Sequence, residues 1–384
     1  MYKVSSYYDI TENLRSTGNF RSIPAGNSDG RALIDLSSND YLGLAEMQSL
    51  QERFFSDRAN RLIPMTSSAA RLLAGRQEEY LNLEKFLEEL YLRPALLFNS
   101  GYHANTGLIS SLAQAGKTLI VADKLAHASI IDGIVLSKAD FTRFRHNDLN
   151  HLERILAKDA AKYDRVIIAV ESVYSMDGDR ADINALAEFK ERYPNILLYV
   201  DEAHAFGVEG KQGLGLCRES SKYENVDVVV GTFGKAAASM GAFAAVSREI
   251  KDYLINRARS FIFSTALPPI SAAWTRYMIE TFLPMDDRRE HLRKLGHILH
   301  NILQPLSPDF TITPSHIQPM IIGEASRTVE ASMSLREEGF KVLPIRTPTV
   351  PPGTERLRIS LSAALTVEDI ARFGEALKQI MASL

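Results

Sequence analysis

Short apolar runs alternate along this chain with longer stretches in which apolar residues recur at helical spacing. The apolar runs are rich in β-branched residues and bounded by Gly, Asp or Asn, which predicts buried strands. These expected strands are 95–98, 118–122, 165–170, 196–200 and 226–230. Helices are expected between them, at 105–115 and 183–192 among others. Strands and helices in alternation predict an α/β fold with a mostly parallel sheet.

The pattern changes towards the C-terminus. A helix is expected at 270–283, directly after a Pro-Pro pair, and Pro284 ends it. A smaller α+β lobe is then expected, with helices at 291–303, 329–338 and from 367, and strands near 319–323 and 356–361. We therefore expect three parts, which are an N-terminal arm that contributes to the small domain (1–45), a large domain (46–286) and a small C-terminal domain (287–384).

Composition and charge narrow the class of protein. Of the 384 residues, 45% are hydrophobic and 24% charged, which is typical of a globular protein with a sizeable core. The net charge is only −3, so nothing favours a nucleic-acid partner. The one cysteine, Cys217, excludes an intrachain disulfide framework and a Cys-rich metal site. No apolar run approaches the ~18 residues of a membrane span, so we expect a cytoplasmic protein with no membrane partner and no metal.

The most informative polar segment follows the expected strand at 196–200. Its sequence, DEAHAFGVEGKQGLG, places Asp201 and His204 between that strand and a glycine-rich loop. Ligands of open α/β sheets bind at the carboxyl ends of strands, so Asp201 is well placed to face one. A buried carboxylate is costly without a cationic partner, so we expect Asp201 to meet a positive group. A helix cap at Asp201 and a core histidine at His204 stay open as the simpler interpretation.

A lysine follows the next expected strand, at 226–230. Lys235 is preceded by glycine and followed by three alanines. Such small apolar surroundings favour a neutral amine, which can form an imine with an aldehyde. A solvated loop lysine is the alternative. It is weakened because Asp201 and Lys235 close successive strands, and the ends of such strands are neighbours in a parallel sheet.

Further strand ends supply polar groups. Gly101 and Tyr102 begin an expected helix after a strand, and backbone N–H groups at such a start form an anion site. His127 opens another expected helix, where a capping or core role and a ring that stacks on a planar heterocycle are both open. Ser175 follows the strand at 165–170, which places a hydroxyl near the other strand ends.

Together these strand ends suit a ligand with a phosphate, a carbonyl that reacts with lysine and a ring nitrogen that meets an aspartate. Pyridoxal 5′-phosphate has all three. Asp201 would keep the pyridine nitrogen protonated and so strengthen the electron sink. Lys235 would hold the aldehyde and later move protons, while Gly101 and Tyr102 would bind the phosphate. A dinucleotide-dependent dehydrogenase is disfavoured, because no Gly-x-Gly-x-x-Gly turn follows an expected strand.

A family resemblance follows from the same segments and runs from about residue 35 to 369. The chain resembles the α-oxoamine synthases, a branch of the aspartate-aminotransferase-like (fold-type I) pyridoxal-phosphate enzymes. The resemblance implies that fold, a large domain with a mostly parallel sheet plus a smaller α+β domain. The ordered motifs that carry it are SSNDYLGLA (37–45), FNSGYHAN (98–105), DKLAHAS (123–129), ESVYSMDGD (171–179), VDEAHAFGVEGKQGLG (200–215), GTFGKA (231–236) and FSTALPP (263–269).

The resemblance also implies a role for particular residues. Lys235 is similar to the lysine that carries the cofactor, Asp201 to the partner of the pyridinium nitrogen, and His127 to the histidine stacked on the ring. The resemblance implies that Lys235, Asp201 and His127 are the catalytic residues and that all three also contact the cofactor. The other implied cofactor contacts are Gly101, Tyr102, Ser175, His204, Thr232, Ser264 and Thr265. Ser264 and Thr265 resemble hydroxyls that reach a phosphate in the neighbouring subunit of a homodimer.

Substrate positions are implied in the same way. Arg358, with Asn39, resembles the site for an amino-acid carboxylate, and an arginine fork suits a carboxylate. Arg21 and Thr349 match acyl-substrate positions. Within the family the segment 344–366 is most similar to the enzymes that make 8-amino-7-oxononanoate for biotin, which implies L-alanine and an acyl thioester of coenzyme A or a carrier protein. A sister synthase that uses glycine and a non-catalytic scaffold subunit are the alternatives.

One segment departs from the family pattern. Relatives have a glycine- and serine-rich segment where this chain reads MTSSAARLLAGRQ, residues 65–77. Arg71 and Gly75 keep the frame, but Ser67, Ser68, Ala69 and Ala70 replace the residues before that arginine. Because the segment lies near the acyl-thioester site in relatives, the departure bears on acyl-chain preference and not on the cofactor chemistry.

Overall fold

A computed structural model of the chain describes residues 6–23, 32–74 and 77–384. The chain divides into two compact units. The large unit comprises Leu42–Ser175 and Arg180–Arg289. The small unit comprises the described part of 1–41 together with Met176–Asp179 and Glu290–Leu384. Both ends of the chain therefore contribute to the small unit.

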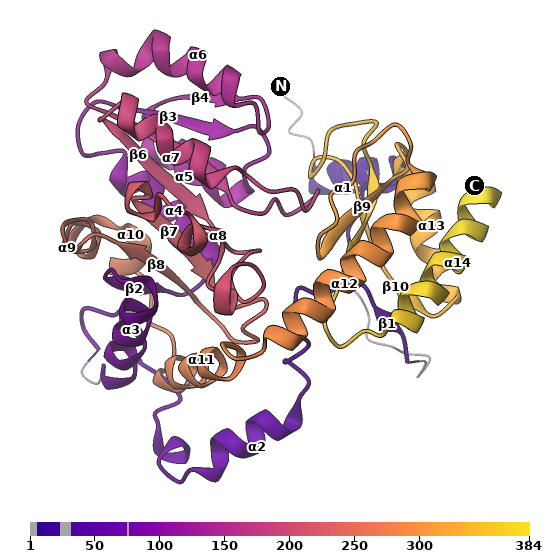
Figure 1. The fold of residues 1–384 in the computed structure, drawn as a ribbon, viewed down its shortest axis with the longest axis horizontal. Coiled ribbons are helices and arrows are strands. Elements are labelled where there is room, and N and C mark those ends of the chain that lie inside the picture. Colours follow the sequence, from indigo (N-terminus) through magenta and orange to yellow (C-terminus); the bar gives the residue numbers. More distant parts are fainter. Residues whose placement is uncertain (1–5, 24–31, 75–76) are drawn as a thin grey trace. The chain divides into compact units, whose positions relative to one another are not determined.

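The large unit is built on one seven-stranded sheet with the order β2-β8-β7-β6-β5-β3-β4 (Figure 1). Only β8 runs antiparallel to its neighbours, β2 and β7, and the other pairings are parallel. The strands are β2 (Ala95–Phe98), β3 (Thr118–Asp123), β4 (Asp140–Phe144), β5 (Arg165–Glu171), β6 (Ile196–Asp201), β7 (Val228–Thr232) and β8 (Ala242–Val246). The central strands are buried along their whole length, which explains their continuous apolar runs.

Helices cover both faces of this sheet (Figure 1). The helices of the large unit are α2 (Gln48–Ser56), α3 (Glu78–Tyr91), α4 (Gly101–Leu112), α5 (Ala128–Ser137), α6 (Leu149–Asp159), α7 (Ile183–Arg192), α8 (Leu216–Glu219), α9 (Arg248–Arg257), α10 (Arg259–Ile262) and α11 (Pro269–Phe282), and α2 lies away from the sheet. On one face α4 packs on β7 and β8, and α5 packs against α4. Gly133 permits that close helix packing, since a Cβ there would lie 3.0 Å from both Asn105 O and Ile109 Cβ.

The small unit contains a three-stranded antiparallel sheet in the order β11-β12-β9 and a two-stranded parallel pair of β1 and β10. Its elements are α1 (Tyr7–Ser16), β1 (Ile34–Asp35), β9 (Ile317–Ile321), α13 (Ala325–Glu337), β10 (Phe340–Lys341), β11 (Leu343–Ile345), β12 (Arg356–Ser360) and α14 (Val367–Ser383). α12 (Asp286–Leu303) supplies the residues from Glu290 onward. β12 is the central strand, and its five residues are all buried.

Several element boundaries differ from the expected ones for local reasons. The helix expected from residue 105 begins at Gly101, because the Ser100 side chain caps it by accepting from the His103 backbone. The helix expected from 291 begins at Asp286, just after Pro284, and its acidic first turn suits a helix N-terminus. Within the described parts of the chain, no helix is long and apolar enough to cross a membrane.

Candidate active site

Parallel pairing brings the polar ends of three strands together. Glu171 at the end of β5 pairs in register with Asp201 at the end of β6, and Asp201 pairs with Val230 of β7. Thr232 closes β7, and Lys235 follows three residues later. The sequence expectation that Asp201 and Lys235 close neighbouring strands is therefore correct as to topology. Asp201, Glu171 and Thr232 are all buried.

Lys235 and His204 are in direct contact. The Lys235 Nζ lies 2.7 Å from His204 Nε2, so the imidazole can accept a hydrogen bond from the amine. His204 is buried, whereas Lys235 is partly exposed. Of the three alanines that follow Lys235, Ala236 and Ala237 are fully buried and Ala238 is partly exposed. A lysine amine that contacts an imidazole in apolar surroundings is suited to imine chemistry.

Asp201 is held by donors on both carboxylate oxygens. Its Oδ1 accepts from the Ala203 backbone N–H at 2.8 Å, and its Oδ2 accepts from the Asn105 side chain at 2.6 Å. The first contact closes a local turn and not a helix cap, because no helix begins at Asp201, so the simpler interpretation of this residue as a helix cap is wrong. Each oxygen keeps a further lone pair, because an ionised carboxylate offers about four acceptor sites. Asp201 can therefore still meet a protonated ring nitrogen.

His127 is both a helix cap and an exposed ring. It occupies the N-cap of α5, where Nδ1 accepts from the Ser129 backbone N–H at 3.2 Å. Desolvation lowers the pKa of His127 below its usual value; the charge of Asp201 opposes this shift and the charge of Lys235 adds to it. The charges of Asp201 and Lys235 thus both act on the His127 ring, so the three expected catalytic residues lie within electrostatic range of one another. The N-cap role agrees with one of the two interpretations of His127 that the sequence left open.

The start of α4 (Gly101–Leu112) is where the sequence predicts an anion site. Ser100 caps the helix, and Gly101 lies beside the end of β7, since a Cβ at Gly101 would lie 3.6 Å from Thr232 Cβ. The Tyr102 hydroxyl donates to Asp132 on α5, and this hydrogen bond raises the pKa of Tyr102. The Tyr102 hydroxyl is therefore engaged within the protein, and its backbone N–H is the group free to serve the helix start.

The remaining expected cofactor contacts lie at nearby strand ends or in one loop. Ser175 is buried four residues after the end of β5. The Thr232 hydroxyl donates to Gly241 O at 3.1 Å and accepts from Gly234 N at 3.3 Å. Ser264 and Thr265 lie between α10 and α11, and the Thr265 carbonyl accepts from the Asn99 side chain at 2.7 Å.

The segment that departs from the family pattern packs against this same loop. Ala70 forms an isolated antiparallel bridge with Thr265, and the Ser67 hydroxyl donates to Leu267 O at 2.6 Å. Ser68 has a positive φ of 52°, a conformation that glycine adopts without strain, which gives a physical reason for glycine in this segment of relatives. Arg71 is buried in an ion pair with Glu84 at 3.0 Å. Gly75 lies outside the described residues.

The expected substrate residues pair within the small unit. Arg358 is buried on β12, and its Nη2 donates to Asn39 Oδ1 at 3.2 Å. The same Asn39 oxygen accepts from the Tyr41 hydroxyl at 3.0 Å. Arg21 Nη2 donates to the Thr349 hydroxyl at 2.9 Å. Arg358 thus contacts Asn39, and Arg21 contacts Thr349, although Arg21 and Thr349 are far apart in the sequence.

Sequence reasoning missed two buried polar residues of the site, Asn105 and Glu171. Asn105 joins Asp201 to Ser129 on α5. Burial, and next the charge of Asp201, raise the pKa of Glu171 well above its usual value. Glu171 stands first in the segment ESVYSMDGD, and its place at the end of an apolar strand was a usable signal. Asn105 lies inside a helix, where sequence alone gives no sign of its partners.

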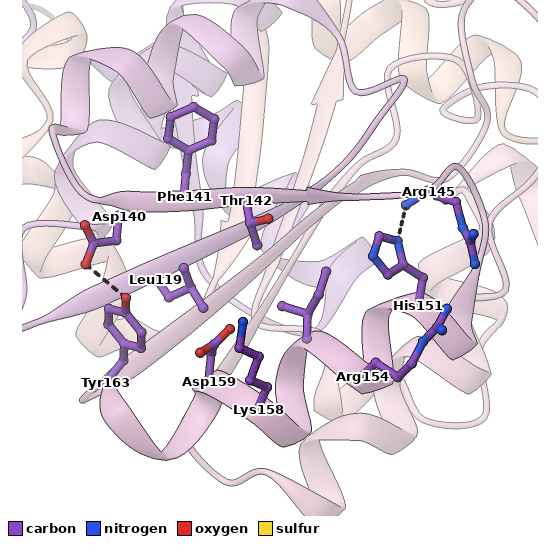
Figure 2. Close-up of a pocket in the computed structure, with 11 residues that line it drawn as sticks. Leu119, Asp140, Phe141, Thr142, Arg145, His151, Arg154, Lys158, Asp159 and Tyr163 are labelled. Carbon is purple, nitrogen blue, oxygen red and sulfur yellow. Dashed lines mark hydrogen bonds between the residues drawn. The ribbon is translucent and has the colours of Figure 1, made fainter.

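A separate surface cavity of about 750 Å3 lies between β4 and α6 (Figure 2). Asp140 accepts a hydrogen bond there from the Tyr163 hydroxyl at 3.0 Å. At its other end the Arg145 backbone donates to His151 Nδ1 at 2.9 Å. These contacts tie the edge strand to the helix, and none of the expected site residues lines the cavity.

Comparison with known proteins agrees with this fold. Residues 31–377 match the family described as aminotransferase class I and II. A relative from Pasteurella multocida (strain Pm70), described as "Putative 8-amino-7-oxononanoate synthase", is 44% identical over 382 residues, which cover 97% of this chain and 98% of the relative. A relative of the same description from Glaesserella parasuis (serovar 5, strain SH0165) is 50% identical over 339 residues, or 88% of this chain and 89% of the relative.

Solved structures give the same fold. Serine palmitoyltransferase of Sphingomonas wittichii has a TM-score of 0.85 and 29% identity, covering 92% of this chain and 88% of its own. The 8-amino-7-oxononanoate synthase of Francisella tularensis has a TM-score of 0.76 and 28% identity, covering 93% and 98%. The chain belongs to the aminotransferase class I and II family, and within it to the α-oxoamine synthases. It is therefore a pyridoxal-phosphate-dependent acyltransferase with the fold-type I architecture.

The residues present fit that cofactor. Lys235 offers an amine beside an imidazole acceptor, and Asp201 offers a buried carboxylate with unused lone pairs. Gly101 leaves room at the start of a capped helix, where a phosphate is stabilised by backbone N–H groups. These three groups lie at the carboxyl ends of β2, β6 and β7 or directly after them.

Proposed function

We propose that this protein condenses L-alanine with a pimeloyl thioester and releases CO2, the free thiol carrier and 8-amino-7-oxononanoate, a step of biotin biosynthesis. One observation carries the proposal. Relatives that share 43–50% of their residues with most of this chain are described as 8-amino-7-oxononanoate synthases. The solved serine palmitoyltransferases share 25–29% and the solved 8-amino-7-oxononanoate synthase shares 28%, so the proposal rests on the relatives and not on the solved structures.

The large unit provides the groups for proton and charge movement. The Lys235 amine would hold the cofactor through its aldehyde, and as a free amine it would remove the Cα proton of alanine and return one to the product. Asp201 would keep the ring nitrogen protonated. His127 would donate a hydrogen bond to the oxygen of the reacting thioester. When bound, pyridoxal phosphate supplies the carbonyl that reacts with amines and the electron sink.

We assign substrate binding to residues of the small unit and phosphate binding to residues of the large unit. The guanidinium of Arg358, with the Asn39 side chain, would bind the alanine carboxylate by charge-assisted hydrogen bonds. Arg21 and Thr349 would bind the acyl substrate. The remaining proposed cofactor contacts are Gly101, Tyr102, Ser175, His204 and Thr232, with Ser264 and Thr265 acting on the phosphate held by a second subunit.

We further propose that the protein acts as a cytoplasmic homodimer. Support comes from large apolar side chains that are 52–80% exposed on one stretch of the large unit, namely Leu62, Met65, Leu72, Leu73 and Leu81. Exposed apolar groups gathered in one region mark a protein interface. The same stretch contacts the loop of Ser264 and Thr265, which suits hydroxyls that act across an interface.

The main alternative is a sister synthase that uses glycine in place of alanine. Both amino acids present one carboxylate to Arg358, so the pair Arg358–Asn39 does not separate them. Discrimination rests on room for one methyl group, which is worth only about 1–3 kcal/mol. A scaffold subunit without activity is disfavoured because Lys235, the residue such a protein would lose, is present.

A product assay tests the proposal. The purified protein, loaded with pyridoxal phosphate, is given alanine, glycine or serine with acetyl, succinyl, pimeloyl and palmitoyl thioesters, and products are identified by mass spectrometry. We expect alanine with the pimeloyl thioester to give the highest kcat/KM and glycine to be a slow substrate. An outright preference for glycine, or for serine with the palmitoyl thioester, would replace the proposed reaction by that of the matching sister enzyme.

A further inference from the structure

A chain of hydrogen bonds links Asp201 to His127 through Asn105 and Ser129, two buried residues that are not themselves among the expected cofactor contacts. Asn105 on α4 is buried, as are Tyr199 on β6 and Ser129 on α5. The Asn105 amide nitrogen donates to Asp201 Oδ2 at 2.6 Å and to Ser129 Oγ at 2.9 Å. The Ser129 hydroxyl lies 2.7 Å from His127 Nδ1. We call these contacts the Asn105 relay.

The orientation of the Asn105 amide follows from its partners. An ionised carboxylate only accepts hydrogen bonds, so the amide nitrogen and not the amide oxygen must face Asp201. The amide oxygen then accepts from the Tyr199 hydroxyl at 2.6 Å. Burial, and next the charge of Asp201, raise the pKa of Tyr199 well above its usual value, so this hydroxyl keeps its proton and donates. All three polar contacts of the amide are thereby assigned.

The direction of the Ser129 hydroxyl follows in turn. Its oxygen accepts one amide proton of Asn105, which leaves its own proton for His127 Nδ1. The Ser129 backbone N–H points to the same ring nitrogen, at 3.2 Å. A ring nitrogen that receives two donors has to be the unprotonated one. Since desolvation also lowers the pKa of His127, the neutral ring carries its proton on Nε2.

We propose that Asn105 and Ser129 are positioning residues that hold His127 as the neutral tautomer with its proton on Nε2 and tie this state to the ionised Asp201. The ring can then act only as a hydrogen-bond donor through Nε2, because Nδ1 is occupied. Its use as a donor to the thioester oxygen rests on the proposed function, whereas the tautomer itself does not.

The close packing of α4 on α5 makes the relay possible. Ser129 lies one helical turn before Gly133, the residue at which α4 and α5 come closest through Asn105 and Ile109. A larger residue at Gly133 would push the helix that carries Asn105 away from the helix that carries Ser129. The relay therefore depends on the crossing of two helices and not on either alone.

Nitrogen NMR of the histidine rings tests the tautomer without any activity measurement. The full chain is labelled with 15N in its nine histidine rings, and the His127 signals are assigned by their loss in His127→Asn. At neutral pH, with and without cofactor, we expect a protonated Nε2 and an unprotonated Nδ1. A protonated Nδ1 in the wild-type protein would refute the relay, and this result needs no folded variant beyond the assignment.

Variants then test the positioning role. Ser129→Ala keeps the backbone donor to His127 but removes the hydroxyl, so we expect NMR signals of both tautomers. We also expect kcat to fall about 10-fold and KM to change little. This loss is one part of the roughly 100-fold or larger contribution that a positioned proton donor makes. Ser137→Ala, which removes a hydroxyl at the other end of α5, is the matched control and should change neither. Unchanged tautomer signals in Ser129→Ala would overturn the role of Ser129. If the tautomer shifts as expected but the proposed product is absent in the wild type, the proposed function fails and the relay stands.

Discussion

Individual buried carboxyls determine how this protein responds to pH. Glu202, next to Asp201, is fully buried, and its Oε1 accepts from the Cys217 backbone at 3.0 Å. Burial raises the pKa of Glu202 to about 7, although backbone donors near Cys217 oppose the shift. The folded protein thus holds this proton more tightly than the unfolded chain does. Stability linked to Glu202 is fully present below about pH 4.5 and is lost as pH rises to about 7.

Glu202→Gln should therefore flatten the pH dependence of stability. The carboxyl lowers the free energy of unfolding of the wild type by about 3 kcal/mol between those two pH values, at ~1.4 kcal/mol per pH unit. The amide has no such titration. Urea unfolding at several pH values from 4.5 to 8 measures the difference, with the exposed Glu219→Gln as control. Parallel wild-type and Glu202→Gln profiles would show that Glu202 does not titrate in this range.

Arg358 gives a second prediction at this scale. Removing its guanidinium in Arg358→Ala should lower kcat/KM for alanine and glycine by the same factor, roughly 30- to 1000-fold, because both amino acids lose the same charge-assisted contact. Steady-state kinetics with each amino acid measures the two factors. A variant that loses alanine but spares glycine would mean that Arg358 reads the side chain and not the carboxylate.

At the scale of elements, the loop after β6 depends on its glycines. Gly207, Gly210, Gly213 and Gly215 all have positive φ, between 74° and 90°. At Gly215 a Cβ would lie 2.1 Å from Glu202 Oε2, so the loop wraps closely around that buried carboxyl. The glycine-rich character of the motif DEAHAFGVEGKQGLG thus has a structural cause as well as a place beside the site.

Gly215→Ala should destabilise the protein more than Gly339→Ala does. Both glycines have φ near 90°, so both variants carry the backbone cost of about 1–2 kcal/mol for a left-handed residue. A Cβ at Gly339 would have no atom within 4 Å, whereas a Cβ at Gly215 meets the Glu202 carboxylate. Chemical denaturation gives the free energy of unfolding of both variants, and the difference between them measures the cost of the clash with Glu202. Equal losses of unfolding free energy would show that the Glu202 side chain moves aside freely.

The elements that the sequence predicted best are short and locally determined. The strand at 95–98 and the helix at 183–192 have the expected bounds, because Pro94 precedes the one and the Asp182 side chain caps the other. β8 was missed because its sequence, AFAAV, lacks the β-branched run of a strand, and β4 because it is an exposed edge strand. Asp201 and Lys235 could be paired from strand order, whereas Asn105 could not, since its contacts depend on how α4 crosses α5.

At the scale of the whole molecule, the proposed dimer should divide each active site between two chains. Lys235→Ala removes a group of one chain, and the double variant Ser264→Ala/Thr265→Ala removes hydroxyls proposed to act on the partner's phosphate. Each variant alone should be impaired. Mixed dimers place one complete site in each heterodimer, so remixing equal amounts should restore about a quarter of wild-type activity. No recovery on remixing, despite exchange of subunits seen by native mass spectrometry, would assign these hydroxyls to their own chain's site.

The most direct test of the central claim is the stoichiometry of the reaction. Alanine labelled with 13C in its carboxyl group and a pimeloyl thioester are incubated with the loaded protein, and labelled CO2, free thiol and 8-amino-7-oxononanoate are quantified together. We predict one of each per turnover in the wild type and none above background in Lys235→Ala. Thiol release without matching labelled CO2 and amino ketone, or equal turnover in Lys235→Ala, would contradict a decarboxylative condensation carried by this lysine.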